Sequence, residues 1–217
     1  MRDRFIEQLK SLHKGLIEMG EQCESVITMA TDALINNNKA GAESVSVLDT
    51  DIDHQERDIE SLCLKLLLQQ QPVASDLRQI SAALKMITDM ERIGDQAADI
   101  AELVKYIDGD PIINMTKIGD MAKHVIYMVT ESVNAYVKKD VTLAQNIIKY
   151  DDEVDDLFNE MKNEIIDIIA KKNDDAEKAV DLLMIAKYLE RIGDHATNIA
   201  EWAVFSVTGV HKSDELS

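Results

Sequence analysis

The chain is poor in residues that break helices, cross-link chains or build sheet cores. Its 217 residues include two prolines and two cysteines, and only 4% of them are aromatic. With 46% hydrophobic residues and so little proline, the composition favours an ordered, largely helical protein over a disordered one. Scarce aromatic residues together with ten methionines suit packing between helices better than a sheet core.

Positive charge is also scarce. The 23 lysines and arginines face 41 aspartates and glutamates, which leaves a net charge of −18. Nucleic acids and anionic membranes require a basic face, so neither is expected as a direct partner. The negative charge also argues against free phosphate or another anion as a ligand, unless a metal lies between it and the protein. Cys23 and Cys63 fall in helical periodicity outside any C-x-x-C pattern, which predicts buried free thiols in a reducing compartment.

Long apolar segments are absent. Runs such as 182–186 are far too short to cross a bilayer, and the opening residues Met1-Arg2-Asp3-Arg4 lack the apolar region of a signal peptide. The sequence therefore predicts a cytoplasmic protein without direct membrane insertion.

Hydrophobic residues recur every three or four positions, and no stretch shows the alternation of a strand. This pattern predicts an all-α protein of six long helices. Long helices joined by short turns are typical of antiparallel bundles. The predicted helices cover approximately 4–36, 39–70, 75–107, 112–138, 141–170 and 175–207.

The breaks between these segments divide the chain into two matching halves. Pro72 ends the second helix because proline lacks an amide hydrogen, and we expect Ser75 to cap the third. Asp140 is expected to cap the fifth helix. The D-G-D-P turn at 108–111 is the clearest break. We predict three-helix domains over 1–108 and 112–208, followed by a flexible tail over 209–217.

One motif occurs twice. The pattern E-R-I-G-D-x-A-x-[DN]-I-A-E begins at Glu91 and again at Glu190, 99 positions later. Its first and fifth residues lie four apart and therefore share one face of a helix. Those residues are Glu91 and Asp95 in the first copy, and Glu190 and Asp194 in the second. The hydrophobic stripe predicts that this face packs against neighbouring helices.

Both copies place a carboxylate and a glycine on the packing face. A carboxylate there is costly unless it is paired or bound to a cation. A second carboxylate one turn away adds repulsion of about 0.2–0.5 kcal/mol, and more when desolvated. Glycine in mid-helix costs about 1 kcal/mol relative to alanine, so Gly94 and Gly193 indicate close approach of another group. The combination indicates a bound cation.

A second acidic pattern also recurs. D-x-x-[IV]-D places Asp49 and Asp53 in the second helix and Asp151 and Asp155 in the fifth. In an antiparallel three-helix bundle, each of these helices lies beside the helix that carries the longer motif, with the two acidic levels side by side. Each half can therefore gather four or five carboxylates from two helices.

Two interpretations of these carboxylates compete. Arg92 and Arg191 follow the motif glutamates and could simply form salt bridges with them, but the recurrence of both acidic pairs in both halves favours cation binding. Oxygen ligands suit hard cations such as Mg²⁺, Ca²⁺, Mn²⁺ or iron. His195 aligns with Gln96 and is either a surface residue, the favoured interpretation, or an extra ligand.

Known enzyme signatures are not found. None of the five histidines follows a glutamate by three positions, which argues against a di-iron oxidase. The sequence contains no Walker loop, dinucleotide fingerprint or Ser-His-Asp set. We therefore expect no catalytic residues and no enzymatic activity.

The two three-helix halves, each with D-x-x-[IV]-D on the second helix and the ERIGD motif on the third, resemble the PhoU family. The Q-P-V-A-S-D-L-R turn at 71–78 also resembles that family, and the likeness covers 4–207. The resemblance implies a two-bundle fold with multinuclear metal clusters, containing iron, or manganese, magnesium or zinc as substitutes. The implied metal ligands are Asp49, Asp53, Glu91, Asp95 and Asp99, then Asp151, Asp155, Glu190, Asp194 and Asn198. Because Asn198 replaces Asp99 and lacks its charge, the two sites should not be identical.

The resemblance also implies a function. PhoU-like proteins are cytoplasmic regulatory adaptors that act with the ATPase of the phosphate ABC transporter and with a sensor histidine kinase. They keep phosphate-starvation genes off when phosphate is plentiful, and they form homodimers. Two alternatives from other classes remain: a metal-dependent enzyme that uses the acidic clusters, and a structural dimer whose acidic seams are salt-bridged.

Overall fold

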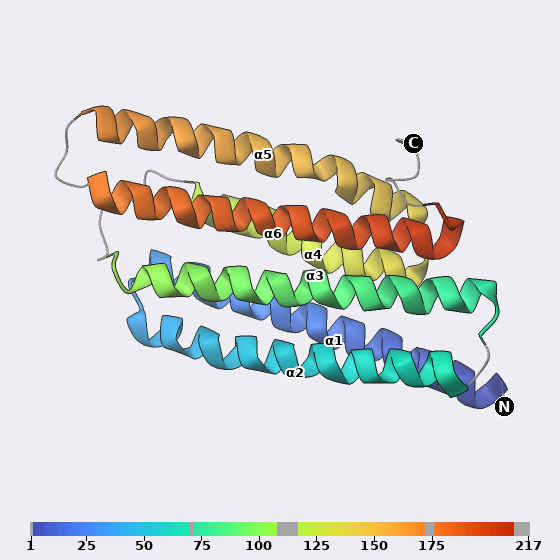
Figure 1. The fold of residues 1–217 in the computed structure, drawn as a ribbon. Coiled ribbons are helices and arrows are strands. Elements are labelled where there is room, and N and C mark those ends of the chain that lie inside the picture. Colours follow the sequence, from blue (N-terminus) through green and yellow to red (C-terminus); the bar gives the residue numbers. More distant parts are fainter. Residues whose placement is uncertain (1, 70–71, 108–116, 172–175, 211–217) are drawn as a thin grey trace.

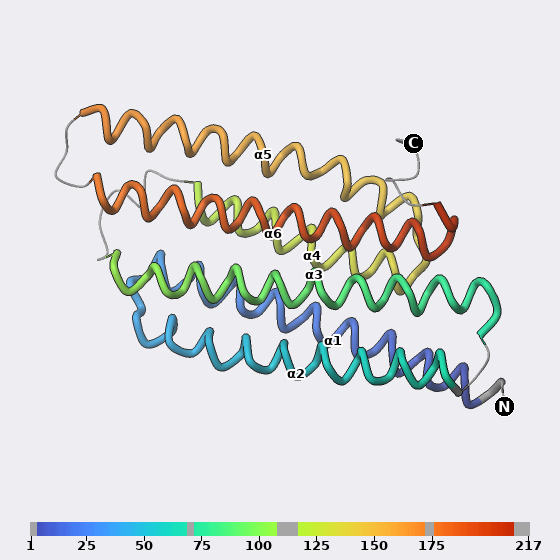
Figure 2. Tube along the Cα trace, viewed as in Figure 1, coloured from blue at the N-terminus to red at the C-terminus, as the bar shows by residue number. Residues whose placement is uncertain are grey.

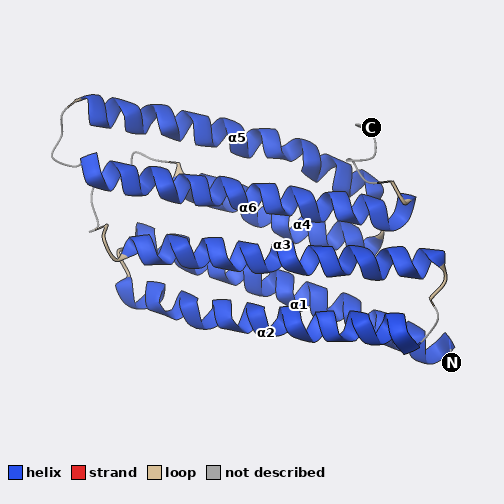
Figure 3. Cartoon of the chain, viewed as in Figure 1, coloured by secondary structure: helices blue, strands red, loops and turns tan. Residues whose placement is uncertain are grey.

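The computed structural model describes residues 2–69, 72–107, 117–171 and 176–210. Within these ranges every regular element is a helix, which confirms the predicted all-α class (Figures 1 and 3). No helix in these ranges is long and apolar enough to cross a membrane. The helices are α1 (Arg2–Ile35), α2 (Lys39–Gln69), α3 (Ala74–Val104), α4 (Ile118–Lys138), α5 (Val141–Ala170) and α6 (Ala176–Thr208).

The helices form two three-helix bundles that lie side by side and share one hydrophobic core. α1 and α3 of the first bundle contact α4 and α6 of the second, while α2 and α5 lie at the outer edges (Figure 2). The most extensive contact joins α3 and α6, which run antiparallel (Figure 1). The two helices that carry the ERIGD motif therefore lie back to back at the centre of the molecule.

Most predicted helix limits agree with the structure to within a few residues. α3 ends three residues earlier than predicted, because the amides of Lys105 and Tyr106 turn back onto the carbonyls of Glu102 and Leu103. The predicted break at 108–111, the start of the fourth helix at 112 and the tail from 211 onward lie outside the described residues.

Local capping explains several helix ends. The backbone of Lys139 adopts a left-handed conformation (φ 56°) after α4, and the carboxylate of Asp140 accepts a 2.9 Å hydrogen bond from the amide of Leu143, which confirms its predicted role. The prediction of Ser75 as a cap was wrong. Val73 occupies the capping position without a side-chain hydrogen bond, since the extended backbone after Pro72 allows α3 to begin one residue before Ser75.

Both cysteines are buried and free, as predicted. The Cys23 thiol donates a 3.4 Å hydrogen bond to the carbonyl oxygen of Met90 on α3, and burial raises the pKa of this thiol to about 12. Burial likewise raises the pKa of Cys63 to about 12. These side chains are therefore protonated components of the core rather than nucleophiles.

A buried tyrosine joins the two bundles at one end. The hydroxyl of Tyr136 on α4 donates a 2.8 Å hydrogen bond to the carbonyl oxygen of Gln79 on α3. The ring of His13 on α1 packs edge-on against Tyr136, with centroids 5.7 Å apart. Because α1 and α3 belong to the first bundle and α4 to the second, these contacts fix the register of the two bundles.

Candidate metal centres

The first acidic cluster lies where α2 passes close to α3. Gly94 makes this approach possible: a Cβ atom at Gly94 would lie 2.8 Å from Oδ1 of Asp49 and 3.1 Å from Cδ1 of Ile52. The carboxylate of Asp49 therefore occupies the space that a side chain on α3 would otherwise fill. Glu91 and Asp95 stand one turn apart on the same helix, beside this position.

Negative charge in this cluster is poorly compensated. The pKa of Asp49 is raised to about 6, first by burial and then by the charges of Asp95 and Asp53. Oδ1 of Asp49 is buried and has no hydrogen-bond partner among the described residues. The pKa of Glu91 is also raised, by burial and by Asp95. An ionised carboxylate without a partner in such a place is costly and favours a proton or a cation.

Two arginines neutralise part of this charge. The guanidinium of Arg92 lies 2.9 Å from Oδ2 of Asp95 and 3.4 Å from Oε2 of Glu91, and Arg57 lies 3.9 Å from Asp53. The salt-bridge interpretation is thus correct for the outer part of the cluster. Both arginine side chains are more than half exposed, so their ion pairs stabilise the protein little. Neither satisfies the buried oxygen of Asp49.

The second cluster repeats this arrangement between α5 and α6. The pKa of Asp151 is raised to about 6, by burial first and then by Asp194 and Asp155. A Cβ atom at Gly193 would lie 3.4 Å from Oδ1 of Asp151, an ordinary contact distance. The second pair of helices therefore fits less tightly at the motif glycine than the first pair.

In the second cluster a lysine from the preceding turn pairs with the motif glutamate. Lys187 forms an ion pair with Glu190 one turn along α6, and its ammonium lies 5.3 Å from the centroid of the Phe158 ring. Burial, followed by the charge of Glu190, raises the pKa of both Asp155 and Asp194. This cluster also concentrates more negative charge than its neighbouring cation balances.

Two of the predicted ligands take part in the α3–α6 interface. The amide of Asn198 donates a 3.0 Å hydrogen bond to Oδ1 of Asp89, and Nδ1 of His195 lies 2.9 Å from the same oxygen. Asp99 accepts a hydrogen bond from the hydroxyl of Tyr188, although its pKa is still raised by burial and by Asp95. His195 is thus a partner of Asp89 across the interface.

These two interface contacts are related by the internal repeat. With the offset of 99 positions, Asp89 corresponds to Tyr188, and Asp99 corresponds to Asn198. On each motif helix, the ninth residue of the motif therefore contacts the other motif helix. Its partner there lies two positions before the motif glutamate. Asp89 and Tyr188 are not predictable from the repeated motif, since the residues at this position differ in chemistry between the two copies.

The donor set fits a hard cation, although the side chains do not form a closed coordination shell. Across the described ranges, no group of three or more histidine, cysteine, aspartate or glutamate side chains is close enough to hold an ion. Each cluster nevertheless offers oxygen donors from two helices, and Asp49 adds a buried oxygen without a partner among the described residues. Oxygen ligands of this kind are the ones that hard cations prefer.

The two motif glycines should respond differently to alanine. Gly193→Ala places its Cβ at ordinary contact distances, so the gain in helix propensity should raise the free energy of unfolding by up to about 1 kcal/mol. Gly94→Ala forces the Asp49 carboxylate to move, and this cost should cancel the gain or exceed it by about 1 kcal/mol. Urea denaturation of the matched pair measures the difference. Equal stabilisation by both would contradict the close contact between Gly94 and Asp49.

The acidic clusters should make metal-free protein less stable at neutral pH than at mildly acidic pH. Asp49 and Asp151 have folded-state pKa values of about 6, above their usual value of 3.8. Between roughly pH 4 and pH 6 the folded chain holds protons that the unfolded chain has released, so the stability from these groups falls as pH rises through this window.

The measurement is thermal unfolding in chelator across this pH range. The double variant Asp49→Asn, Asp151→Asn should show a smaller fall with rising pH and a higher melting temperature at pH 7.5 than the unmodified chain. An unchanged pH profile in the double variant would contradict the assignment.

The chain matches one protein family and several of its members. The PhoU domain family matches it twice, over residues 16–104 and 118–203. A phosphate-specific transport system accessory protein PhoU homolog from Clostridium acetobutylicum is 36% identical over 210 residues, covering 96% of each chain. A homolog of the same name from Zymomonas mobilis is 34% identical over 209 residues, covering 94% of this chain and 87% of the relative.

Solved structures give the same result. The crystal structure of PhoU from Pseudomonas aeruginosa superposes with a TM-score of 0.85 at 30% identity, covering 95% of this chain and 100% of the other. The phosphate transport system regulatory protein PhoU from Streptococcus pneumoniae superposes with a TM-score of 0.86 at 26% identity, covering 95% and 98%. The duplicated three-helix fold and the matches over both halves lead to one conclusion: this chain belongs to the PhoU family.

Proposed function

We propose that this protein is a regulatory adaptor of phosphate uptake. The observation that carries the proposal is its similarity, over 96% of its length, to a relative named as an accessory protein of the phosphate-specific transport system. A similar solved structure is titled a regulatory protein of phosphate transport. In this role the chain acts in the cytoplasm as a homodimer. It links the ATPase of the phosphate ABC transporter to a sensor histidine kinase and restrains the phosphate-starvation response.

The accessory-protein names of the relatives favour this role over a metal-dependent enzyme. The described functional groups agree with that preference. Burial raises the pKa of both thiols to about 12, which keeps them protonated and poorly nucleophilic. Surfaces rather than a reacting centre are therefore expected to carry the function.

The acidic clusters are proposed to bind multinuclear groups of metal ions. The metal would be iron, with manganese, magnesium or zinc as a substitute. Asp49, Asp53, Glu91 and Asp95 would hold the first group, and Asp151, Asp155, Glu190 and Asp194 the second. A bound cation would supply positive charge to balance these carboxylates. Asp99 and Asn198 contact Tyr188 and Asp89 across the α3–α6 interface, and each keeps an oxygen that could join its group.

Binding to the two partners tests the adaptor role. The purified chain should bind the transporter ATPase or the cytoplasmic part of the sensor kinase from the same organism, as measured by isothermal titration calorimetry. Deletion of its gene should raise expression of a phosphate-starvation reporter in phosphate-rich medium, and the intact gene should restore repression. Absence of binding to both partners, with unchanged reporter expression, would overturn the proposal.

Metal binding has its own test. Purified protein should contain metal by elemental analysis, and a chelator should lower its melting temperature by roughly 5–10 °C, as expected for a ligand about 100-fold above its dissociation constant. The Asp49→Asn, Asp151→Asn variant should lose both the metal and the chelator effect. A chain that contains no metal and is insensitive to chelator would remove the metal from the proposal and leave the adaptor role intact.

A further inference from the structure

The second acidic cluster already contains a cation that belongs to the protein itself. Lys187 lies on α6, one turn before Glu190, and its ammonium donates hydrogen bonds to both carboxylate oxygens of that glutamate. Only 13% of the Glu190 side chain is exposed, against 45% of the Lys187 side chain. The lysine therefore extends from the surface to a carboxylate that lies largely inside the cluster.

The same ammonium also reaches the neighbouring helix. It lies 5.3 Å from the centroid of the Phe158 ring on α5, within the range of a cation–π contact. Burial and the charge of Glu190 raise the pKa of Asp155 on α5 and of Asp194 on α6, and the charge of Lys187 partly offsets both rises. Lys187 therefore acts on three of the four carboxylates proposed as ligands in this cluster.

The first repeat lacks the groups that hold this ammonium. The offset of 99 positions between the two ERIGD motifs pairs Lys187 with Thr88. The offset of 102 positions between the two D-x-x-[IV]-D patterns pairs Phe158 with Glu56. Thr88 is exposed, and its hydroxyl donates a hydrogen bond to a carbonyl oxygen of its own helix. The first repeat thus has neither the lysine nor the ring, and it has a carboxylate at the position of the ring.

Positive charge is placed differently in the first cluster. Arg92 pairs with Glu91 and Asp95 on its own helix, α3, and its side chain is 55% exposed. These pairs leave the buried oxygen of Asp49, on α2, without a partner among the described residues. In the second cluster, by contrast, Lys187 contacts groups on both helices.

We propose that Lys187 is a tethered counter-ion that a metal ion must displace from the second cluster. The ammonium and a divalent cation require the same carboxylate oxygens of Glu190, and they repel each other at the distances that such binding imposes. The second cluster therefore binds metal more weakly than the first, and metal binding there releases Lys187 from Glu190. The inference rests on the metal binding proposed above and adds a residue that regulates it.

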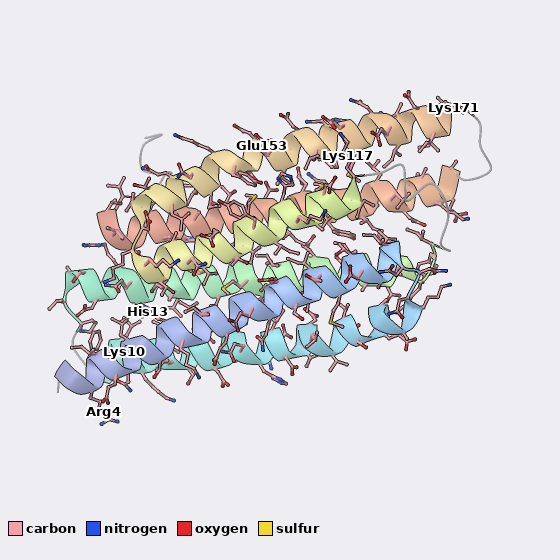
Figure 4. All side chains as sticks on the ribbon, turned by 180° about the vertical axis from the view of Figure 1, so that it is seen from behind. Arg4, Lys10, His13, Lys117, Glu153 and Lys171 are labelled. Carbon is pink, nitrogen blue, oxygen red and sulfur yellow. The ribbon has the colours of Figure 1, made fainter. Side chains whose placement is uncertain are left out.

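The position of Lys187 allows this release. Its side chain is partly exposed, and α5 lies at the outer edge of the second bundle, where Glu153 is marked in Figure 4. A lysine ammonium sits on a flexible four-carbon stem and is strongly hydrated. Side-chain rotation is therefore sufficient to move the ammonium from Glu190 into solvent, without a change in the helices.

The affinity of each cluster is measured with Mn²⁺ by isothermal titration calorimetry, in chains that keep one cluster intact. Asp49→Asn with Asp53→Asn disables the first cluster, and Asp151→Asn with Asp155→Asn disables the second. The first cluster should bind Mn²⁺ roughly fivefold more tightly than the second. In the chain that keeps the second cluster, Lys187→Gln should tighten binding roughly fivefold, the effect of removing one ion pair.

Two matched variants control this comparison. Lys187→Arg keeps the positive charge and should leave the second cluster as weak as in the chain that carries Lys187. Lys123→Gln removes a lysine charge on α4, where Lys123 pairs with Asp120, and should not change the affinity. Circular dichroism and melting temperature check that all variants remain folded.

Release of Lys187 has a separate measurement. Brief acetylation by acetic anhydride, followed by mass spectrometry of peptides, reports how accessible each lysine is. Saturating Mn²⁺ should raise the acetylation rate of Lys187 severalfold and leave that of Lys123 unchanged. An acetylation rate of Lys187 that does not rise with bound Mn²⁺ would show that the lysine stays in place and would overturn the inference.

The calorimetric outcomes separate this inference from the proposed function. If the two clusters bind Mn²⁺ equally and Lys187→Gln changes nothing, the lysine does not compete and the proposed metal binding stands. If Lys187→Gln weakens binding in a folded chain, the lysine supports the site, which also overturns the inference. If neither cluster binds Mn²⁺, the proposed metal binding falls together with the inference, and the adaptor role is unaffected.

Discussion

The close approach of paired helices at two motif glycines places carboxylates in a packed seam, and the rest of the molecule is arranged around that constraint. At Gly94 the missing side chain leaves room for Asp49, whose buried oxygen has no partner in the described part of the chain. Burying an unpaired carboxylate disfavours its ionised form. The seam therefore holds a local excess of negative charge that a proton, a cationic side chain or a metal ion can neutralise.

Each motif helix contacts different neighbours with different faces. Their acidic face meets α2 or α5, and another face forms the contact between α3 and α6. Asp89, His195 and Asn198 on one side, and Asp99 and Tyr188 on the other, connect the two clusters through the centre of the molecule. Direct side-chain contacts therefore join the helix of one acidic cluster to the helix of the other.

The two repeats differ in the residues and contacts around their acidic clusters. The first pairs its motif carboxylates with Arg92, whereas the second uses Lys187 from the preceding turn. The glycine contact is tighter in the first repeat, at 2.8 Å against 3.4 Å. The first repeat also keeps a carboxylate at Asp99, where the second has the neutral Asn198. The two repeats therefore share one backbone arrangement but differ in the charges around each cluster.

Much of this molecule could be read from its sequence. Helical periodicity and the turn residues determined the all-α class, the two repeats and most helix limits, because burial on one face and the loss of a backbone amide at proline act locally. The recurrence of Glu91 with Asp95, and of Glu190 with Asp194, also identified the acidic helices, because residues four apart on a helix share one face. The sequence also indicated buried thiols at Cys23 and Cys63.

Other features depended on tertiary structure. Only packing decided that α3 and α6 meet antiparallel, that His195 and Asn198 converge on Asp89, and that Arg92 neutralises part of the first cluster. Likewise, Ile17 on α1 and Val133 on α4 line one surface depression although they are far apart along the chain. Contacts between helices depend on crossing geometry and register, and a pattern of spacing within one helix does not specify them.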